Sequence, residues 1–429
     1  MWIELLMAGL LLIMQPPDDT EDVDTVVHLS LHDPSGKAMR AFHKSLKRTE
    51  GGRGITRIMQ FGASHTAADI LTGYLRDDLQ KRYGDAGIGW FMPARPWRTH
   101  RHSRILHDNP RSKRSRWDWD AVRHKKSWRD DGRYGLAGMA TTATHKRQWT
   151  KFATRRNSKA ARLEIYFDKS KNGGDFYLQR DSERRTRHRT RGRGLGSVTK
   201  TFMDGPHSFH LRPRGNGPVR LYGGVLERDT TGVVFDTLGI NGARAASMLK
   251  WDYRLWAQLV KKRRPDLVIL AYGTNEAGDK DEPIGVYQSN LRQVVERVRR
   301  AAPNASCVLF GPTDRPILED RAAKKNVKDV DKTFRIRPRL DLINQSQRTI
   351  SAEYGCAYFD AIEATGGRFS IVSWADREPR LAYGDYVHLT NRGYRILARR
   401  FLQALLPASS KGNTPDAPPT TSTRPVRGS

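Results

Sequence analysis

The sequence FGASHT at residues 61–66 places a serine, Ser64, between an apolar run at 55–61 and a helical pattern that begins at residue 67. A small turn of this kind, from strand to helix, presents a side chain at a helix N-terminus. Free backbone amides at that end carry partial positive charge and can hold an anion. Ser64 is therefore the side chain best placed to act as a nucleophile, and we expect the other chemical groups of the chain to be brought to it.

A carboxylate and an imidazole lie near the other end of the chain, in the sequence DYVHLT at residues 385–390. Asp385 and His388 are three residues apart, and Thr390 is a suitable N-cap for a helix expected at 391–405. This spacing lets the Asp385 carboxylate reach the near nitrogen of His388 while the far nitrogen faces the active site. Together with Ser64, the two residues meet the requirements of an activated serine nucleophile.

Two glycine-containing loops follow predicted strands and offer hydrogen-bond donors. The strand at 233–238 leads to GINGA at 239–243, and the strand at 267–272 leads to GTNE at 273–276. A tetrahedral intermediate of acyl transfer needs donors for its oxyanion, and losing one typically costs about 2.7–4 kcal/mol. The expected donors are the amides of Ser64 and Gly242 and the side chain of Asn275. Asp314 follows a third strand, but we expect it to serve a turn.

Strands and helices alternate along two separated parts of the chain, which predicts a parallel sheet covered by helices on both faces. Ligands bind such sheets at the carboxyl ends of the strands, where Ser64, Gly242 and Asn275 all lie. Between the two parts, short strand-like runs at 162–167, 175–179, 198–203, 208–211 and 219–226 predict an antiparallel β-sandwich. The expected domains are 1–25 (signal or anchor and linker), 26–97 (α/β domain, first part), 98–231 (inserted sandwich), 232–406 (α/β domain, second part) and 407–429 (disordered tail).

The four stretches that contain Ser64, Gly242, Asn275 and His388 resemble, in order and in context, the Ser, Gly, Asn and His blocks of the SGNH (GDSL) hydrolase superfamily. The resemblance covers residues 56–97 and 233–406 and implies a three-layer, flavodoxin-like α/β domain. The Ser-His-Thr continuation and the β-rich insert look like bacterial peptidoglycan and polysaccharide O-acetylesterases, whose insert resembles a carbohydrate-binding module. The family usually has Asp where this chain has Ala63 and Glu276. The loss at Ala63 is expected to loosen the nucleophile turn or alter the rate without removing a catalytic group.

The resemblance assigns a role to each residue of the four blocks. Ser64 would be the nucleophile, with Asp385 and His388 as its acid and base partners. Gly242 and Asn275 would be oxyanion donors.

The charge of the chain is concentrated in the insert. The formal net charge is +30, and residues 97–229 contain 33 Lys and Arg against 13 Asp and Glu, a balance of +20. Such charge favours anionic polymers, whether glycan, nucleic acid or a membrane surface. No recognised nucleic-acid motif accompanies it, so an anionic glycan is the expected partner. The densest arginines are expected in one hairpin loop, where a solvated loop is the competing interpretation: Arg184, Arg185, Arg187, Arg189, Arg191 and Arg193.

No cofactor or metal is expected. His100, His102 and His107 lack accompanying cysteines and a recognised ligand spacing. The tryptophans of this region could stack on sugar rings, but we expect most of them to pack between insert and hydrolase domain: Trp90, Trp97, Trp117, Trp119 and Trp128. Cys307 and Cys356 each lie at a strand-like run; buried free thiols are favoured over a single bridge between neighbouring strands.

The N-terminal residues 1–14 are nearly all apolar, the length of a signal-peptide core. Glu4 interrupts the run and no Lys or Arg precedes it. Export to the periplasm, cell envelope or medium is favoured over an uncleaved anchor or a misassigned start. Residues 407–429 are rich in Pro, Ser and Thr and are expected to be disordered.

These observations predict a serine esterase that removes acyl groups, acetyl being expected, from a carbohydrate polymer such as peptidoglycan. A small-molecule esterase or an O-acyltransferase would use the same residues. The alternative from another class is a catalytically idle hydrolase core whose basic insert binds an anionic polymer.

Overall fold

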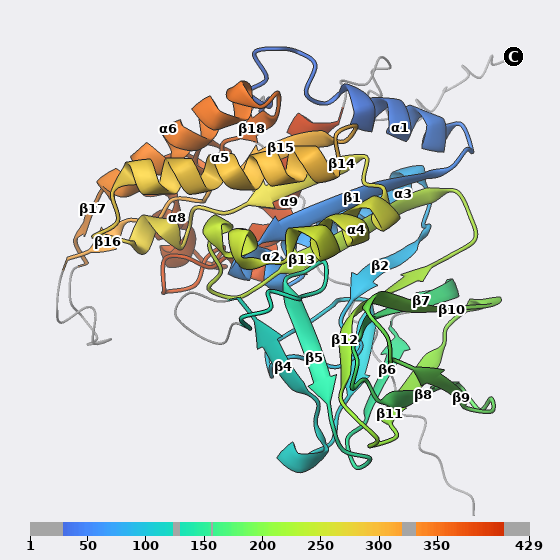
Figure 1. The fold of residues 1–429 in the computed structure, drawn as a ribbon. Helices are drawn as coiled ribbons and strands as arrows, with labels where there is room; N and C mark the ends of the chain where they lie inside the picture. Colours follow the sequence, from blue (N-terminus) through green and yellow to red (C-terminus); the bar gives the residue numbers. More distant parts are fainter. Residues whose placement is uncertain (1–28, 123–128, 156–157, 320–331, 407–429) are drawn as a thin grey trace, which may run out of the picture.

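The computed structural model describes residues 29–122, 129–155, 158–319 and 332–406 of the chain (Figure 1). The expectations for the two chain ends, 1–25 and 407–429, and for Trp128 lie outside the described residues. Within the described ranges, no helix is both long enough and apolar enough to cross a membrane.

A five-stranded parallel sheet, with the spatial order β13-β1-β14-β15-β18, forms the centre of the part of the chain that the sequence predicted to be α/β (called the hydrolase part after that prediction). In chain order this is 2-1-3-4-5, the order of flavodoxin-like sheets. Each strand predicted from an apolar run is present, with ends shifted by one or two residues. The strands are β1 (Ile55–Gly62), β13 (Gly232–Gly239), β14 (Leu267–Ala271), β15 (Ser306–Phe310) and β18 (Ala357–Phe359).

Helices cover both faces of this sheet, because successive side chains of a strand point to opposite faces. Met59 and Phe61 of β1 belong to the cluster that includes side chains of α4, α5 and α6, whereas Ile58 belongs to the cluster on the side of α1, α3 and α9 (Figure 1). The helices are α1 (Arg40–Glu50), α2 (Ser64–Ala67), α3 (Leu71–Tyr83), α4 (Tyr253–Arg263), α5 (Ile284–Ala301), α6 (Pro338–Glu353), α7 (Ala361–Thr365), α8 (Ser370–Asp376) and α9 (Asn391–Leu405). Short 3-10 turns are η1 (Lys113–Ser115), η2 (Ala245–Lys250) and η3 (Glu276–Gly278).

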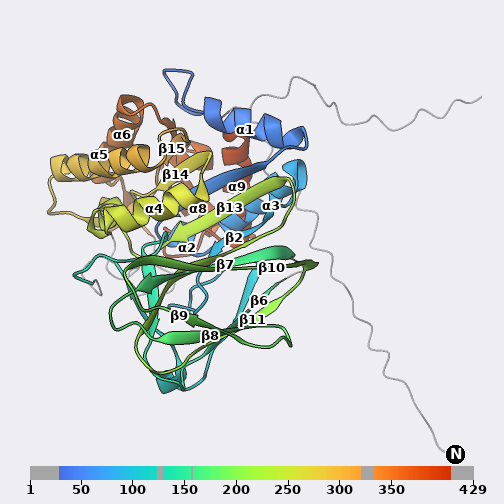
Figure 2. The same ribbon diagram turned by 45° about the vertical axis from the view of Figure 1, so that its right-hand side comes forward.

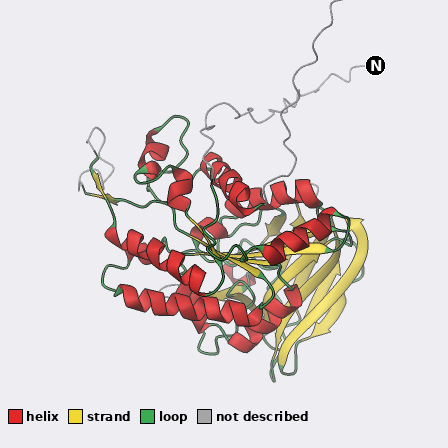
Figure 3. Ribbon diagram, turned by 90° about the horizontal axis from the view of Figure 1, so that it is seen from above, coloured by secondary structure: helices red, strands yellow, loops and turns green. Residues whose placement is uncertain are grey.

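Two antiparallel sheets lie below the parallel sheet in Figure 2, and in the view from above they emerge at one side of the helical part (Figure 3). One has the order β10-β7-β12-β5-β4 with β2 paired to β12, and the other has the order β3-β6-β11-β8-β9. Both contribute side chains to one buried cluster, among them Phe152, Phe167, Phe176 and Phe209. A small separate pair, β16 (Ile317–Leu318) and β17 (Phe334–Arg335), lies in the hydrolase part.

The antiparallel strands include all five that the sequence predicted between residues 162 and 226. Their bounds are β2 (Gly87–Phe91), β3 (Ile105–Asp108), β4 (Asp118–Ala121), β5 (Met139–Ala143), β6 (Thr150–Thr154), β7 (Ala160–Lys169), β8 (Asp175–Arg180), β9 (Thr186–Arg189), β10 (Gly194–Gly205), β11 (Ser208–Pro213) and β12 (Val219–Glu227). β2 lies within the stretch assigned to the hydrolase part, yet it pairs with β12.

The helix expected at 67–83 is interrupted, which corrects the prediction. α2 ends at Ala67 and α3 begins at Leu71, with Asp69 between them at a φ of 50°. The buried Asp69 carboxylate accepts hydrogen bonds from Thr72 and Arg76, so side-chain contacts stabilise a backbone conformation that a continuous helix would exclude.

The arginine-rich run is partly strand, which corrects its assignment to a single hairpin loop. Residues 186–189 form β9, paired with β8, and Arg187 contacts the Asp175 carboxylate at 2.8 Å. The alternation of Arg with other residues leaves Arg187 and Arg189 on the exposed side of the strand.

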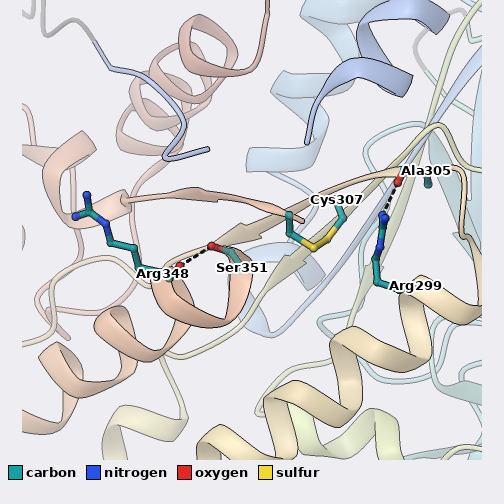
Figure 4. Close-up of a disulfide and its surroundings, with 6 residues drawn as sticks. Arg299, Ala305, Cys307, Arg348 and Ser351 are labelled. Carbon is teal, nitrogen blue, oxygen red and sulfur yellow. Dashed lines mark hydrogen bonds between the residues drawn. A yellow bond between two sulfur atoms is a disulfide. The ribbon is translucent and has the colours of Figure 1, made fainter. Parts of the chain in front are cut away.

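The expectation of free thiols is wrong: Cys307 and Cys356 form a disulfide (Figure 4). β15 pairs with β18 in a register that places Val308 opposite Ala357, so the preceding residues, Cys307 and Cys356, also lie side by side. Their Cα atoms are 4.7 Å apart, within the range that a disulfide requires.

Candidate active site

Ser64 begins α2 directly after β1, at the carboxyl edge of the parallel sheet. The turn before it requires glycine, since a Cβ on Gly62 would lie 2.2 Å from Thr66 Oγ1 and 2.8 Å from the Ala271 carbonyl oxygen. Gln60 Nε2 donates to Thr66 Oγ1 at 3.1 Å, which fastens the first turn of α2 to the strand. The sharp turn thus directs the Ser64 side chain out of the sheet edge.

His388 and Asp385 meet Ser64 at this edge. The distance from His388 Nε2 to Ser64 Oγ is 2.8 Å, and the distance from His388 Nδ1 to Asp385 Oδ2 is 2.6 Å. The other carboxylate oxygen, Asp385 Oδ1, accepts the backbone amides of Val387 and His388, each at 3.0 Å. The carboxylate therefore fixes the orientation of the imidazole, as the spacing of the two residues predicted.

The local backbone holds this turn in place. Tyr386 adopts a φ of 52°, and the Tyr383 amide donates to the His388 carbonyl oxygen at 2.8 Å. Thr390 caps α9 by accepting the Gly393 amide, which confirms the predicted N-cap.

The Asp385 carboxyl is held in its ionised form. Burial disfavours the charge, but hydrogen bonds from the His388 ring and from two backbone amides outweigh it and lower the pKa of Asp385 to about 2. An ionised carboxylate at Nδ1 keeps that nitrogen protonated and leaves Nε2 free to accept a proton from Ser64.

A second histidine, His65, packs beside the first. Its ring centroid is 5.2 Å from that of His388, and its Nδ1 lies 2.7 Å from the Tyr394 hydroxyl oxygen. Burial, together with the neighbouring His388, lowers the pKa of His65 to about 3. His65 is therefore neutral at pH 7 and adds no charge beside His388. The Ser-His-Thr sequence signalled this residue, but its contact with His388 was not predicted.

The loops that carry Gly242 and Asn275 are joined to the Ser64 turn by hydrogen bonds. The Ile240 amide donates to the Gly62 carbonyl oxygen at 3.1 Å, and Asn275 Nδ2 donates to the Ala243 carbonyl oxygen at 2.8 Å. Gly242 has a φ of 76°, and a Cβ there would meet open space. Among the described residues, neither the Ser64 amide nor the Gly242 amide donates a hydrogen bond. Both amides are thus free to bind an oxyanion, and one N–H of Asn275 is already used.

The Glu276 side chain links the loop that carries Gly242 to the loop that carries Asn275, a role that the sequence did not reveal. Its carboxylate accepts the Ala245 amide at 2.8 Å and the Gly273 amide at 3.0 Å, and the residue is only 3% exposed. Burial raises the pKa of Glu276 despite these bonds. The residue that departs from the family pattern therefore connects the Gly242 loop to the Asn275 loop.

Arg315 is a further residue near the site that the sequence did not single out. It donates to the Thr274 carbonyl oxygen, one residue before Asn275. Burial, and then the neighbouring Arg244, lower its pKa. The Arg315 guanidinium therefore lies close to the loops that carry Ser64, Gly242 and Asn275.

The remaining candidates have structural surroundings. The Asp314 carboxylate accepts the amides of Arg315 and Phe369, the turn role expected for it. Trp90 lies in the buried cluster that the parallel sheet shares with antiparallel strands, as expected for packing between the two parts, whereas Trp117 lies in the cluster of the antiparallel sheets themselves. Among the described residues no group of three His, Cys, Asp or Glu side chains could hold a metal ion.

Two comparisons with known proteins show what the chain is similar to. The model of the GDSL-like lipase/acylhydrolase family matches residues 197–396, a range that contains Gly242, Asn275, Asp385 and His388 but not Ser64. A solved structure titled as a peptidoglycan O-acetylesterase in action has a TM-score of 0.71 at 24% identity, covering 87% of this chain and 97% of that chain.

Two family two carbohydrate esterases also match, but their TM-scores are too low to support an argument. The one from Clostridium thermocellum has 13% identity, covers 61% of this chain and 92% of its own, and has a TM-score of 0.27. The one from Cellvibrio japonicus has 10% identity, covers 70% and 98%, and has a TM-score of 0.25. The search of curated proteins found no sequence match. Residues 197–396 thus match the model of the GDSL-like lipase/acylhydrolase family, and the fold of the chain is similar to that of the solved O-acetylesterase.

Proposed function

We propose that this protein is a serine esterase that removes O-acetyl groups from a cell-wall glycan such as peptidoglycan. The observation that carries the proposal is the hydrogen-bonded chain from Asp385 through His388 to Ser64, with donors for an oxyanion beside it. The similarity in fold to a peptidoglycan O-acetylesterase supports the choice of substrate.

The reaction would proceed in two steps. Ser64 Oγ attacks the ester carbonyl while His388 Nε2 takes its proton, and the amides of Ser64 and Gly242 with the Asn275 side chain stabilise the oxyanion. His388 then returns the proton to the departing sugar hydroxyl, which leaves an acetyl-Ser64. Water attacks this acyl-enzyme with His388 again as base, and acetate and free Ser64 are formed. No cofactor enters the scheme.

The antiparallel sheets would bind the glycan on which Ser64 acts. We regard the two antiparallel sheets, which share a buried cluster, as an inserted β-sandwich that resembles a carbohydrate-binding module. Its positive charge would attract an anionic glycan. Export to the cell envelope follows as an expectation from a cell-wall substrate. The idle-core alternative is not favoured, because the hydrogen-bonded chain of three residues is complete.

Substitution of the nucleophile tests the proposal. In Ser64→Ala, release of acetate from acetylated peptidoglycan and of p-nitrophenol from p-nitrophenyl acetate should fall to background, on the order of 10⁶-fold for a residue of this kind. Ser182→Ala is the matched control, because Ser182 is exposed in the turn between β8 and β9, and it should retain full activity. Wild-type protein that hydrolyses neither substrate while folded would refute the esterase. Hydrolysis of p-nitrophenyl acetate alone would refute the glycan substrate.

A further inference from the structure

A groove of about 560 Å³ runs between the hydrolase part and the antiparallel sheets. One wall comes from α3 and the residues just before it, and the other from residues 95–107 and Arg155. The volume falls within the range of about 300–1,000 Å³ that is usual for ligand sites.

The groove begins next to the candidate active site. Ala68, one of its lining residues, follows α2 and donates its amide to the Ser64 carbonyl oxygen at 3.0 Å. Asn391, at the other side, begins α9 three residues after His388. One turn of helix, about 5.4 Å, therefore separates the nucleophile from the start of the groove along the chain.

Two buried histidines in the wall have ring nitrogens without hydrogen-bond partners among the described residues. They are Nδ1 of His100, which is 9% exposed, and Nε2 of His102, which is 6% exposed. The Arg104 amide donates a hydrogen bond to His102 Nδ1 at 3.2 Å, so the proton of the neutral ring is on Nε2. Burial is the main cause that lowers the pKa of both rings to about 3, so both are neutral at pH 7. Both nitrogens are enclosed, so the two rings form uncharged parts of the wall, and other side chains set the charge of the groove.

The charge of the groove is positive. Its two carboxylates are already neutralised, since Asp69 binds Arg76 at 2.8 Å and Asp77 binds Arg104 at 2.6 Å. By contrast, the lining residues Arg101 and Arg155 are exposed, and neither has a carboxylate partner in the described ranges.

Apolar surface accompanies these polar groups. The lining includes Ile70 and Tyr74 on the hydrolase wall and Leu106, which is 48% exposed, on the opposite wall. The guanidinium of Arg395 lies 5.4 Å from the Tyr74 ring centroid and keeps that ring in place. Flat apolar faces with a few fixed polar groups suit the rings of a sugar chain.

We propose that this groove binds a carboxylate-bearing stretch of glycan next to the acylated sugar, with Arg101 and Arg155 contacting the carboxylates and the apolar side chains of the two walls lying against the sugar rings. This inference rests on the proposed function, because it places the polymer on which Ser64 acts. It assigns substrate binding to the junction of the two parts of the molecule and not to the arginine-rich β8–β9 region.

The test compares two double variants with the same change in charge. Arg101→Gln/Arg155→Gln alters the groove, and Arg184→Gln/Arg189→Gln alters exposed arginines at β9. The probe is a peptide-free tetrasaccharide of alternating N-acetylglucosamine and N-acetylmuramic acid without O-acetyl groups, and chitotetraose is its analogue without carboxylates. Binding is measured by calorimetry at low ionic strength, where surface charges are least screened.

We expect the groove variant to raise the Kd of the carboxylate-bearing probe about tenfold and the β9 variant to leave it unchanged. Chitotetraose should bind wild-type protein more weakly, and its Kd should not respond to either variant. The KM for acetylated peptidoglycan should rise with the groove variant while kcat and the turnover of p-nitrophenyl acetate stay constant.

Equal weakening of tetrasaccharide binding by both double variants would show a general charge effect and refute the proposed groove site. Unchanged binding by the groove variant would also refute it. Because the probe carries no ester, this result is independent of catalysis. Failure of Ser64 to release acetate from peptidoglycan would refute the proposed function, and charge-selective binding in the groove would still support the site.

Discussion

Glu276 holds together the two loops that carry Gly242 and Asn275, the proposed oxyanion donors, so its replacement by Gln should slow catalysis without removing a catalytic group. The wild-type carboxylate accepts one backbone amide on each oxygen, from Ala245 and from Gly273. A glutamine of the same shape has one accepting oxygen and one NH₂ group. In either orientation of the glutamine amide, its NH₂ group faces one of the two backbone N–H groups, so one of the two loops loses its hydrogen bond to residue 276.

The size of the effect follows from the bonds that are lost. A hydrogen bond to a charged group contributes about 1.5–3 kcal/mol. Full loss of one oxyanion donor costs about 2.7–4 kcal/mol of transition-state stabilisation. Gly242 lies three residues from Ala245, and Asn275 two residues from Gly273, so their displacement is partial. We expect kcat to fall by about 10- to 100-fold, or about 1.4–2.7 kcal/mol, with little change in KM.

The assay is steady-state hydrolysis of p-nitrophenyl acetate, with a urea titration to establish that each variant is folded. Glu363→Gln is the matched control, because Glu363 is exposed on α7, and its kcat should equal that of the wild type. Glu276→Asp retains both accepting oxygens on a shorter side chain and should lose less activity than Glu276→Gln. A folded Glu276→Gln protein with kcat within about twofold of wild type would refute the link between the two loops and the oxyanion donors.

Two further predictions concern stability. The disulfide spans 49 residues, and Cys307→Ala should lower the free energy of unfolding of the oxidised protein by up to about 4 kcal/mol, measured by urea titration. Reductant should destabilise the wild type and leave the variant unchanged; equal stability of oxidised wild type and variant would contradict this. The pKa of each of His65, His100 and His102 is lowered by burial to about 3, against about 6.5 when unfolded. The unfolded chain therefore takes up protons first as the pH falls, so their contribution to stability is fully present above pH 6.5 and is lost progressively towards pH 3. At pH 5 the loss is at most about 2 kcal/mol for each histidine, and a urea midpoint that stays constant between pH 7 and pH 5 would contradict the burial of neutral imidazoles.

Features set by local sequence could be predicted, because each depends on neighbouring residues. The apolar runs before Ser64 and Asn275 are strands of the parallel sheet, and α9 begins after the Thr390 cap. The approach of His388 to Ser64 is non-local, but both lie next to helix starts at the sheet edge, so the topology of a parallel sheet brings them together.

Features set by the register of distant strands and loops could not be predicted. The disulfide depends on the pairing of β15 with β18, and nothing near Cys307 or Cys356 specifies that register. The contact of Glu276 with Ala245 joins loops that follow different strands, and the sequence shows only that Glu stands where relatives have Asp. The interruption before α3 depends on a buried partner for Asp69, which Arg76 supplies from the following helix.

Two buried groups of charged side chains join the antiparallel sheets to the parallel-sheet part. Asp69 accepts the Ser103 amide as well as Arg76, and Arg263 binds both Asp236 and Glu227, the last residue of β12. Each network joins the parallel-sheet part to a strand or loop of the antiparallel sheets.

Buried ion pairs of this kind add little to stability relative to apolar packing, but breaking one costs about 3–5 kcal/mol, because the remaining charge is left without a partner. Swinging the antiparallel sheets away from α3 would break the hydrogen bond from the Ser103 amide to Asp69 and the ion pair between Arg263 and Glu227. A freely tethered binding module would act by raising the local concentration of its substrate. Here the antiparallel sheets are held against the parallel-sheet part, so the groove has a fixed second wall, and we expect the arginines of that wall to act by their position in the groove as well as by their charge.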